Sequence, residues 1–114
     1  MCIRDSGRSV RGFGGTIPIS GPHERTYADG LLLVGDAAGF TSPLFEGGSH
    51  LALKSAAFAA ETAAAAIAAG DYSKSNMEPY QAAWKKEFPP YEKILKGKTA
   101  LYNLTDDELS LIHI

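Results

Sequence analysis

Cysteine is nearly absent from this sequence, because Cys2 is the only one among its 114 residues. One cysteine excludes an intrachain disulfide framework and offers no basis for a cysteine-ligated metal centre, so we expect no metal site. An excess of one charge is absent as well, since 11 basic and 13 acidic residues leave a net charge of −2. Without a basic patch or stripe, we expect no nucleic-acid partner.

The two ends are related to each other at the level of coding DNA. The hexapeptides "MCIRDS" and "LSLIHI" can be back-translated into strings that are reverse complements, like the mosaic end of a sequencing transposase read on both sides of an insert. We therefore expect residues 1–6 and 109–114 to be sequencing-adapter artefacts and the genuine protein to span 7–108. Excluding Arg4 and Asp5 leaves 10 basic and 12 acidic residues, so the net charge is still −2.

Two short segments in the first third of the chain are extended in character. Residues 16–19, "TIPI", contain a proline, which favours an edge strand or a strand start. Residues 31–34, "LLLV", are four successive large apolar residues, which predicts a strand that is buried on both faces, as in a parallel sheet. Such a strand needs neighbours, and we expect them to come from sequence upstream of Gly7, with residues 16–19 as the one partner within this chain.

A long alanine-rich segment over residues 49–69 predicts one helix, which Gly70 ends. Lys54 and Glu61 fall on nearly the same side, so apolar residues surround most of the helix, and we expect protein to cover most of it. His50, Lys54 and Glu61 interrupt the apolar run, and alanine contributes little to insertion, which argues against a membrane span.

More helices follow after residue 70. A helical spacing of apolar residues ends at Pro89-Pro90 and comprises Tyr80, Ala83, Trp84 and Phe88. We interpret the three aromatic residues among them as a core stripe. A further helix is predicted from Pro90 to about Asn103. Thr105 and Glu108 then have the spacing of a capping box, which marks the start of another helix.

The candidate site lies between the 31–34 strand and the long helix. Gly35 lets the backbone turn, and Asp36 places a carboxylate at the strand end, where open α/β sheets bind ligands. A carboxylate accepts hydrogen bonds from a polyol and repels a phosphate. Ala37 leaves room for a flat or extended group, and Gly47-Gly48 opens a helix whose free N–H groups can receive an electron-rich ring edge. A polyol and such an edge occur together in a flavin nucleotide.

The segment "DGLLLVGDAAGFTSPLFEGGSHLALKSAAFAAE" resembles the C-terminal flavin motif of glutathione-reductase-type FAD oxidoreductases. This group contains aromatic-ring hydroxylases, geranylgeranyl reductases and electron-transfer-flavoprotein:quinone oxidoreductases. The resemblance implies an α/β fold class: the C-terminal fragment of an FAD/NAD(P)-binding, Rossmann-like fold over residues 7–70, followed by a helical tail over 71–108. It also implies that Asp36 binds the ribityl chain and that the backbone of Gly48 and Ser49 meets the flavin. The "GFGG" at residues 12–15 is not a dinucleotide fingerprint, and the family's own GxGxxG would lie upstream.

Within the group, the geranylgeranyl reductases are the most similar branch. Hydroxylases usually carry a histidine and two prolines after the Gly-Asp pair, whereas this chain has Gly39 and a single Pro43. The motifs "GGTIPISGP" and "GDAAGFTSPLFEGG" and the tail ending in "LTDDEL" resemble geranylgeranyl reductases, which implies reduction of isoprenoid C=C bonds with FAD and an external electron donor that the sequence does not identify.

Other readings of the sequence stay open. A quinone oxidoreductase is the first alternative, with a quinone in place of the isoprenoid substrate and an iron–sulfur cluster beyond residue 108. An aromatic-ring monooxygenase is less favoured, and the non-enzyme alternative is a flavin-free helical interaction module. The expected location is cytoplasmic, with peripheral membrane contact if Lys93, Lys96 and Lys98 meet lipid head groups rather than water.

Overall fold

The computed structural model describes residues 11–110. The expected adapter-derived residues 1–6 and 111–114 lie outside this range. Residues 109 and 110 are described, and they belong to α4, the short helix Asp106–Ser110. The division of the chain at residues 6 and 108 stays a prediction.

The sheet is a two-stranded antiparallel hairpin. Strand β1, Tyr27–Ala28, pairs with β2, Leu31–Leu32, in the register Tyr27 to Leu32 and Ala28 to Leu31. The reversal takes place at Asp29-Gly30, where Gly30 has a left-handed φ of 63°. Asp-Gly is a common sequence at such short hairpin loops, because glycine adopts this conformation without steric cost.

This hairpin corrects two expectations. The predicted strand over residues 31–34 is shorter and does not pair with residues 16–19, which form no strand. A partner only a few residues away along the chain costs little loop entropy, so the local hairpin forms instead. Burial on both faces is not seen within the described residues, where Leu31 is 49% exposed and Val34 36% exposed, and the neighbours expected from upstream sequence stay a prediction. The described residues supply one neighbouring strand and a helical layer, which leave part of both faces uncovered.

A single 3₁₀ turn, η1, follows the hairpin over Gly35–Ala38. Gly39 ends it with a left-handed φ of 77°. A Cβ atom at position 39 would lie 2.5 Å from the carbonyl oxygen of Gly21, which is too close for any side chain. Gly39 therefore allows the turn to pack against the segment that precedes β1.

Helix α1 spans Ser49–Ala69, and Gly70, with a φ of 64°, provides its left-handed C-cap. Both predicted boundaries are confirmed. The expected covering was wrong, because only the stripe of Leu51, Ser55, Thr62 and Ala66 is buried, while Leu53 is 75% exposed. Among residues 11–110, this helix packs chiefly against α2 and η1. Among the described residues it is the one helix long and apolar enough to cross a membrane by length and composition, with 22% of its most apolar window buried.

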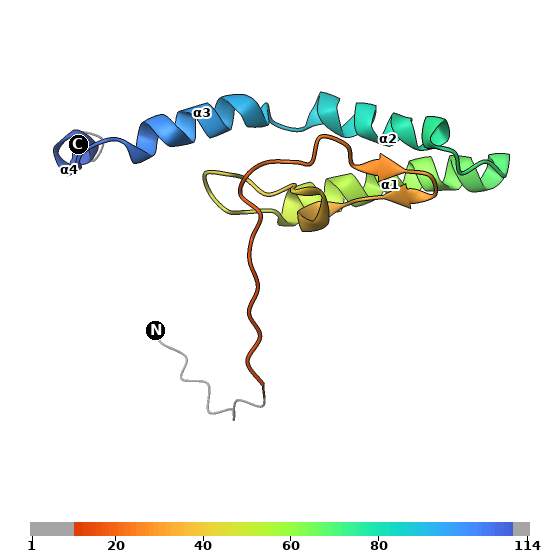
Figure 1. Ribbon diagram of the computed structural model, residues 1–114, viewed down its shortest axis with the longest axis horizontal. Helices are drawn as coiled ribbons and strands as arrows, with labels where there is room; N and C mark the ends of the chain where they lie inside the picture. The colour runs from red at the N-terminus through yellow and green to blue at the C-terminus, as the bar shows by residue number, and fades with distance from the viewer. Residues whose placement is uncertain (1–10, 111–114) are drawn as a thin grey trace.

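Helices α2, Lys74–Glu87, and α3, Tyr91–Tyr102, agree with the predicted pattern and flank Pro89-Pro90. Figure 1 shows α2 running alongside α1 with the hairpin beside them, while α3 continues beyond the end of α2 toward α4. The interpretation of Tyr80, Trp84 and Phe88 as a core stripe is confirmed, since all three are buried. Phe40 completes this core with edge-on contacts to Trp84 and Phe88, at centroid distances of 4.8 and 4.9 Å.

Candidate functional site

The Gly-Asp turn and the first turn of α1 meet at a cavity of about 360 Å³. Three of the six residues predicted to bind the cofactor line it, namely Asp36, Gly48 and Ser49. Gly35, Ala37 and Gly47 do not line it, although each adjoins a residue that does. The remaining lining residues are Ile17, Thr41, Glu46 and Ala52.

Gly35 fixes the turn against α1. Its backbone N–H donates to Ser55 Oγ at 3.0 Å, and the Ser55 hydroxyl in turn donates to the carbonyl of Ala52 at 2.9 Å. Gly35 has a φ of 55°, and a Cβ there would lie 3.1 Å from the Ala52 Cβ. This position therefore requires glycine for close packing of η1 on the helix, a role that lies behind the cavity rather than in it.

Asp36 and Gly48 are brought into direct contact. The hydroxyl of Thr41 donates to Asp36 Oδ1 at 3.2 Å. A Cβ atom at position 48 would lie 3.0 Å from the same oxygen and 3.3 Å from the carbonyl oxygen of Phe40. Glycine at position 48 thus lets the start of α1 approach the carboxylate, and Asp36 itself stays exposed to a ligand in the cavity.

The start of α1 has donors to offer at this cavity. Gly48, its N-cap residue, supplies no side-chain cap, and the first N–H to be satisfied within the helix is that of Ala52, which donates to the Gly48 carbonyl at 2.8 Å. The N–H groups of the first turn are therefore available at the positive end of the helix dipole. An acceptor such as a ring carbonyl or a phosphate is favoured there.

Sequence reasoning missed two of the polar residues in this cavity. Glu46 lines the cavity and has a φ of 55°, a left-handed conformation that is unusual for a residue with a side chain. Thr41, which binds Asp36, carries no periodic or motif signal. The loop that brings both residues in is closed by two backbone bonds, Ser42 N–H to the Gly47 carbonyl and Glu46 N–H to the Ser42 carbonyl, each at 2.9 Å.

Helix α2 holds the strand that leads to the site. The buried hydroxyl of Tyr80 donates to the Leu33 carbonyl, two residues before Gly35. Desolvation raises the pKa of Tyr80 to about 12, so this side chain is a neutral donor. Thr26 is fixed nearby, because its N–H donates to Gln81 Oε1 at 2.9 Å and its hydroxyl accepts from Trp84 Nε1 at 2.8 Å.

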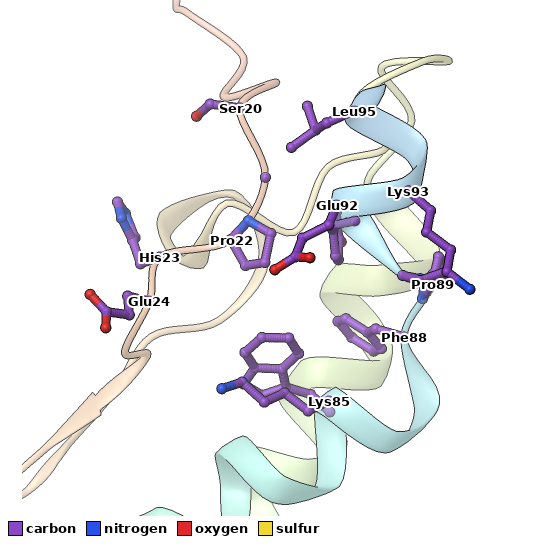
Figure 2. Close-up of a pocket in the computed structure, with 14 residues that line it drawn as sticks. Ser20, Pro22, His23, Glu24, Lys85, Phe88, Pro89, Glu92, Lys93 and Leu95 are labelled. Carbon is purple, nitrogen blue, oxygen red and sulfur yellow. The ribbon is translucent and has the colours of Figure 1, made fainter. Parts of the chain in front are cut away.

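A second cavity, of about 480 Å³, lies between the segment preceding β1 and the junction of α2 and α3 (Figure 2). Its apolar walls include Pro22, Phe88 and Leu95, and Tyr91 lines it as well. The Tyr91 hydroxyl is buried and has no hydrogen-bond partner among the described residues, and desolvation raises its pKa to about 12. No group of three or more metal-ligating side chains lies together within residues 11–110.

Comparison with known proteins finds relatives of this chain. No family model matches the chain. It is 43% identical over 99 residues to a digeranylgeranylglycerophospholipid reductase of Methanocaldococcus jannaschii, covering 86% of this chain and 25% of that protein. It is 49% identical over 74 residues to digeranylgeranylglycerophospholipid reductase 1 of Methanopyrus kandleri, covering 65% of this chain and 20% of that protein. The chain thus spans about a quarter of the length of the curated relatives that it matches.

A solved structure has the same arrangement. The crystal structure of a geranylgeranyl bacteriochlorophyll reductase-like protein from Thermoplasma acidophilum superposes with a TM-score of 0.74 at 33% identity, covering 78% of this chain and 23% of that one. The small sheet, the Gly-Asp turn and the helices packed on them are therefore a segment of a reductase-like fold. The chain belongs to the geranylgeranyl reductase family, which confirms the resemblance seen in its motifs.

Proposed function

We propose that this chain is a fragment of an FAD-dependent oxidoreductase that reduces C=C bonds in the isoprenoid chains of a lipid. Residues 7–70 would complete the Rossmann-like FAD-binding domain, and 71–108 would form the helical region after it. The observation that carries this proposal is the single cavity at which the Asp36 carboxylate and the uncapped start of α1 meet. Neither group alone selects a flavin nucleotide, but their combination suits one.

The residues of the cavity fit the two halves of the proposed cofactor. Asp36 accepts hydrogen bonds from ribityl hydroxyls, and Thr41 holds that carboxylate in place. Backbone N–H groups of Gly48 and Ser49, with Gly47 next to them in sequence, would supply donors to a flavin ring edge, while Gly35 and Ala37 add no bulk to the turn. When bound and reduced, FAD supplies the hydride, while the protein supplies orientation and an apolar environment.

The substrate class rests on the relatives. The curated ones are named as reductases of digeranylgeranylglycerophospholipids, and the structural neighbour as similar to a geranylgeranyl bacteriochlorophyll reductase. All of these names specify prenyl chains of the same type. A lipid substrate also agrees with a cytoplasmic protein that touches a membrane surface, for which the exposed Lys93 and Lys96 on α3 are suitably charged.

The test uses the complete protein that contains this chain. It is purified with FAD, the flavin is reduced chemically, and geranylgeranyl lipid, ubiquinone and an aromatic acid are offered in parallel while product masses are followed. We expect a gain of two hydrogens for each isoprenoid double bond. Quinone reduction alone would reassign the protein to the quinone oxidoreductases, oxygen insertion into the aromatic acid would reassign it to the hydroxylases, and a protein that retains no flavin would favour the interaction module.

A further inference from the structure

Glu46 has an unusual backbone conformation in the loop that leads to α1. Among residues 11–110 it is the one residue other than glycine with a positive φ, 55°. The left-handed region is costly for a residue with a side chain, and such residues persist where the surrounding structure holds them. Here the Glu46 N–H donates to the Ser42 carbonyl and the Ser42 N–H donates to the Gly47 carbonyl, each at 2.9 Å. Glycine would adopt this conformation without cost, so folding alone does not account for a glutamate at this position.

The cavity that Glu46 lines is acidic. Its charged lining residues are Asp36 and Glu46, and no basic side chain of the described chain lines it. The Asp36 carboxylate accepts a hydrogen bond from Thr41. Within residues 11–110 the one ion pair joins Lys54 to Glu87, so Glu46 has no counter-charge there. The negative charge of Glu46 therefore acts on the cavity without a neutralising partner from the described chain.

Glu46 and the start of α1 act on this cavity with opposite sign. The free N–H groups that follow Gly48 form the positive end of the helix dipole, and Glu46 precedes this N-cap residue by two positions. A cavity of about 360 Å³ is comparable in width to the Debye length of about 8 Å at physiological ionic strength, so salt screens neither effect completely. A ligand that gains negative charge in the cavity is stabilised by the helix start and destabilised by Glu46.

We propose that Glu46 lowers the reduction potential of the flavin at this site and so makes the reduced cofactor a stronger hydride donor. The inference rests on the proposed function and adds a role for a residue of this chain. Reduction adds two electrons from an external reductant and one proton to the flavin ring, which leaves one negative charge on it. A fixed carboxylate beside the ring disfavours that charge, and charge near the ring nitrogens is one of the means by which proteins tune a flavin.

The same charge accounts for the direction of the effect on the substrate. Hydride transfer to one alkene carbon, with a proton from water added to the other, returns the ring to its neutral form. Glu46 destabilises the ring before this transfer and has little interaction with it afterwards. The carboxylate thus increases the driving force for reduction of the double bond.

The first experiment measures the midpoint potential of FAD in the complete FAD-loaded protein, by reductive titration against a reference dye. Glu46→Gln keeps the shape of the side chain and removes its charge, so the affinity for reduced relative to oxidised FAD should rise about threefold to tenfold. For a two-electron couple this is a rise of about 15–30 mV. Glu46→Gly removes the same charge, suits the left-handed backbone and should give the same rise. Glu46→Asp should keep most of the parent's potential, and Glu61→Gln, an exposed carboxylate elsewhere on α1, is the matched control.

The second measurement repeats the titration at low and high salt, which separates an electrostatic effect from a change of shape. The difference between Glu46→Gln and the parent should shrink at an ionic strength of about 1 M, where the Debye length falls to about 3 Å. A difference that does not depend on salt would overturn the role of Glu46. The same holds for a parental potential in both the glutamine and the glycine variants.

The mass of the lipid product distinguishes this inference from the proposed function. Unchanged potentials together with a mass gain of the lipid overturn only the role of Glu46. A raised potential in the variants without any mass gain supports Glu46 and refutes isoprenoid reduction. A complete parent protein that retains no FAD overturns both.

Discussion

At the scale of single residues, the site depends on how a carboxylate and a helix start are held together. The Asp36 carboxylate accepts a hydrogen bond from the Thr41 hydroxyl. It lies so close to Gly48 that a methyl group at position 48 would crowd its oxygen. The first residues of α1 add backbone donors without a competing side-chain cap. The cavity is thus built from one acidic side chain and several backbone groups, which is why few of its members stand out in a sequence.

The first prediction at this scale concerns Asp36. Replacing it with alanine in the complete protein should weaken FAD retention by about 1.5–3 kcal/mol, because a charged acceptor for the ribityl hydroxyls is lost. Flavin absorbance after dialysis measures the effect. Glu61→Gln, which removes an exposed carboxylate elsewhere along α1, is the control and should retain its FAD. Equal flavin content in the Asp36→Ala and parent proteins would contradict the assignment.

At the scale of elements, α2 positions the strand that carries the site. Its side chains Tyr80, Gln81 and Trp84 bind the residues that flank the hairpin, namely Thr26 before β1 and the Leu33 carbonyl after β2. Helix α1 meets η1 through the Ser55 bridge to Gly35. Two helices therefore fix one short irregular turn from two sides, and the aromatic contact of Phe40 with Trp84 and Phe88 completes the attachment.

Two tyrosines in this helical region provide a matched test. Tyr80→Phe should destabilise the complete protein by about 1 kcal/mol, because it leaves the Leu33 carbonyl without its donor. Tyr91→Phe should leave stability unchanged or raise it, since it removes a buried hydroxyl that has no partner among the described residues. Chemical denaturation at pH 7 compares them, and an equal loss in both variants would show that the Tyr80 bond contributes little.

The dependence of folding stability on alkaline pH follows from Tyr80. The pKa of Tyr80 is about 12 in the folded chain against an ordinary value of 10.0, so folding favours the protonated form. Its contribution is fully present below pH 10 and is lost as the pH rises toward 12. The parent should therefore lose stability between pH 10 and 12 more steeply than Tyr80→Phe in denaturation series. Parallel curves for the two proteins would contradict this origin.

At the scale of the whole molecule, several large apolar side chains are left exposed to solvent. Leu31, Val34, Leu53 and Ile67 are all at least one-third exposed, and the hairpin has only two short strands. Isolated two-stranded hairpins are marginally stable in water. The uncovered faces of β2 and α1 are suited to contact with further protein rather than with solvent.

We expect the 114-residue chain alone to lack a cooperative unfolding transition and to bind FAD weakly, because its sheet has open faces and the dinucleotide fingerprint is not among its motifs. Circular dichroism during heating and equilibrium dialysis with FAD measure the two properties. The complete protein is the control in both experiments. Stoichiometric FAD together with a sharp transition in the isolated chain would contradict the expectation.

Local patterns determined much of what was predicted correctly. Both ends of α1, the helices around Pro89-Pro90 and the capping box of Thr105 and Glu108 depend on contacts within a few residues, and the last of these is formed, with the Thr105 N–H donating to Glu108 Oε2 at 2.9 Å. The Gly-Asp and Gly-Gly pairs likewise marked the two segments that meet at the cavity. Helix propensity, capping and the conformational freedom of glycine act over short distances, so one sequence is enough to read them.

Only the tertiary structure decided the partner of β2, the exposed side of α1 and the roles of Thr41, Glu46 and Thr26. The hairpin was available from Asp29-Gly30, but choosing it over residues 16–19 requires comparing loop entropies and side-chain packing over the whole fold. The coverage of α1 depends on which elements exist to pack against it, which its own periodicity does not specify. Single polar residues such as Gln81, which contacts Thr26 from 55 positions away, acquire a role only when folding brings their partners within hydrogen-bond distance.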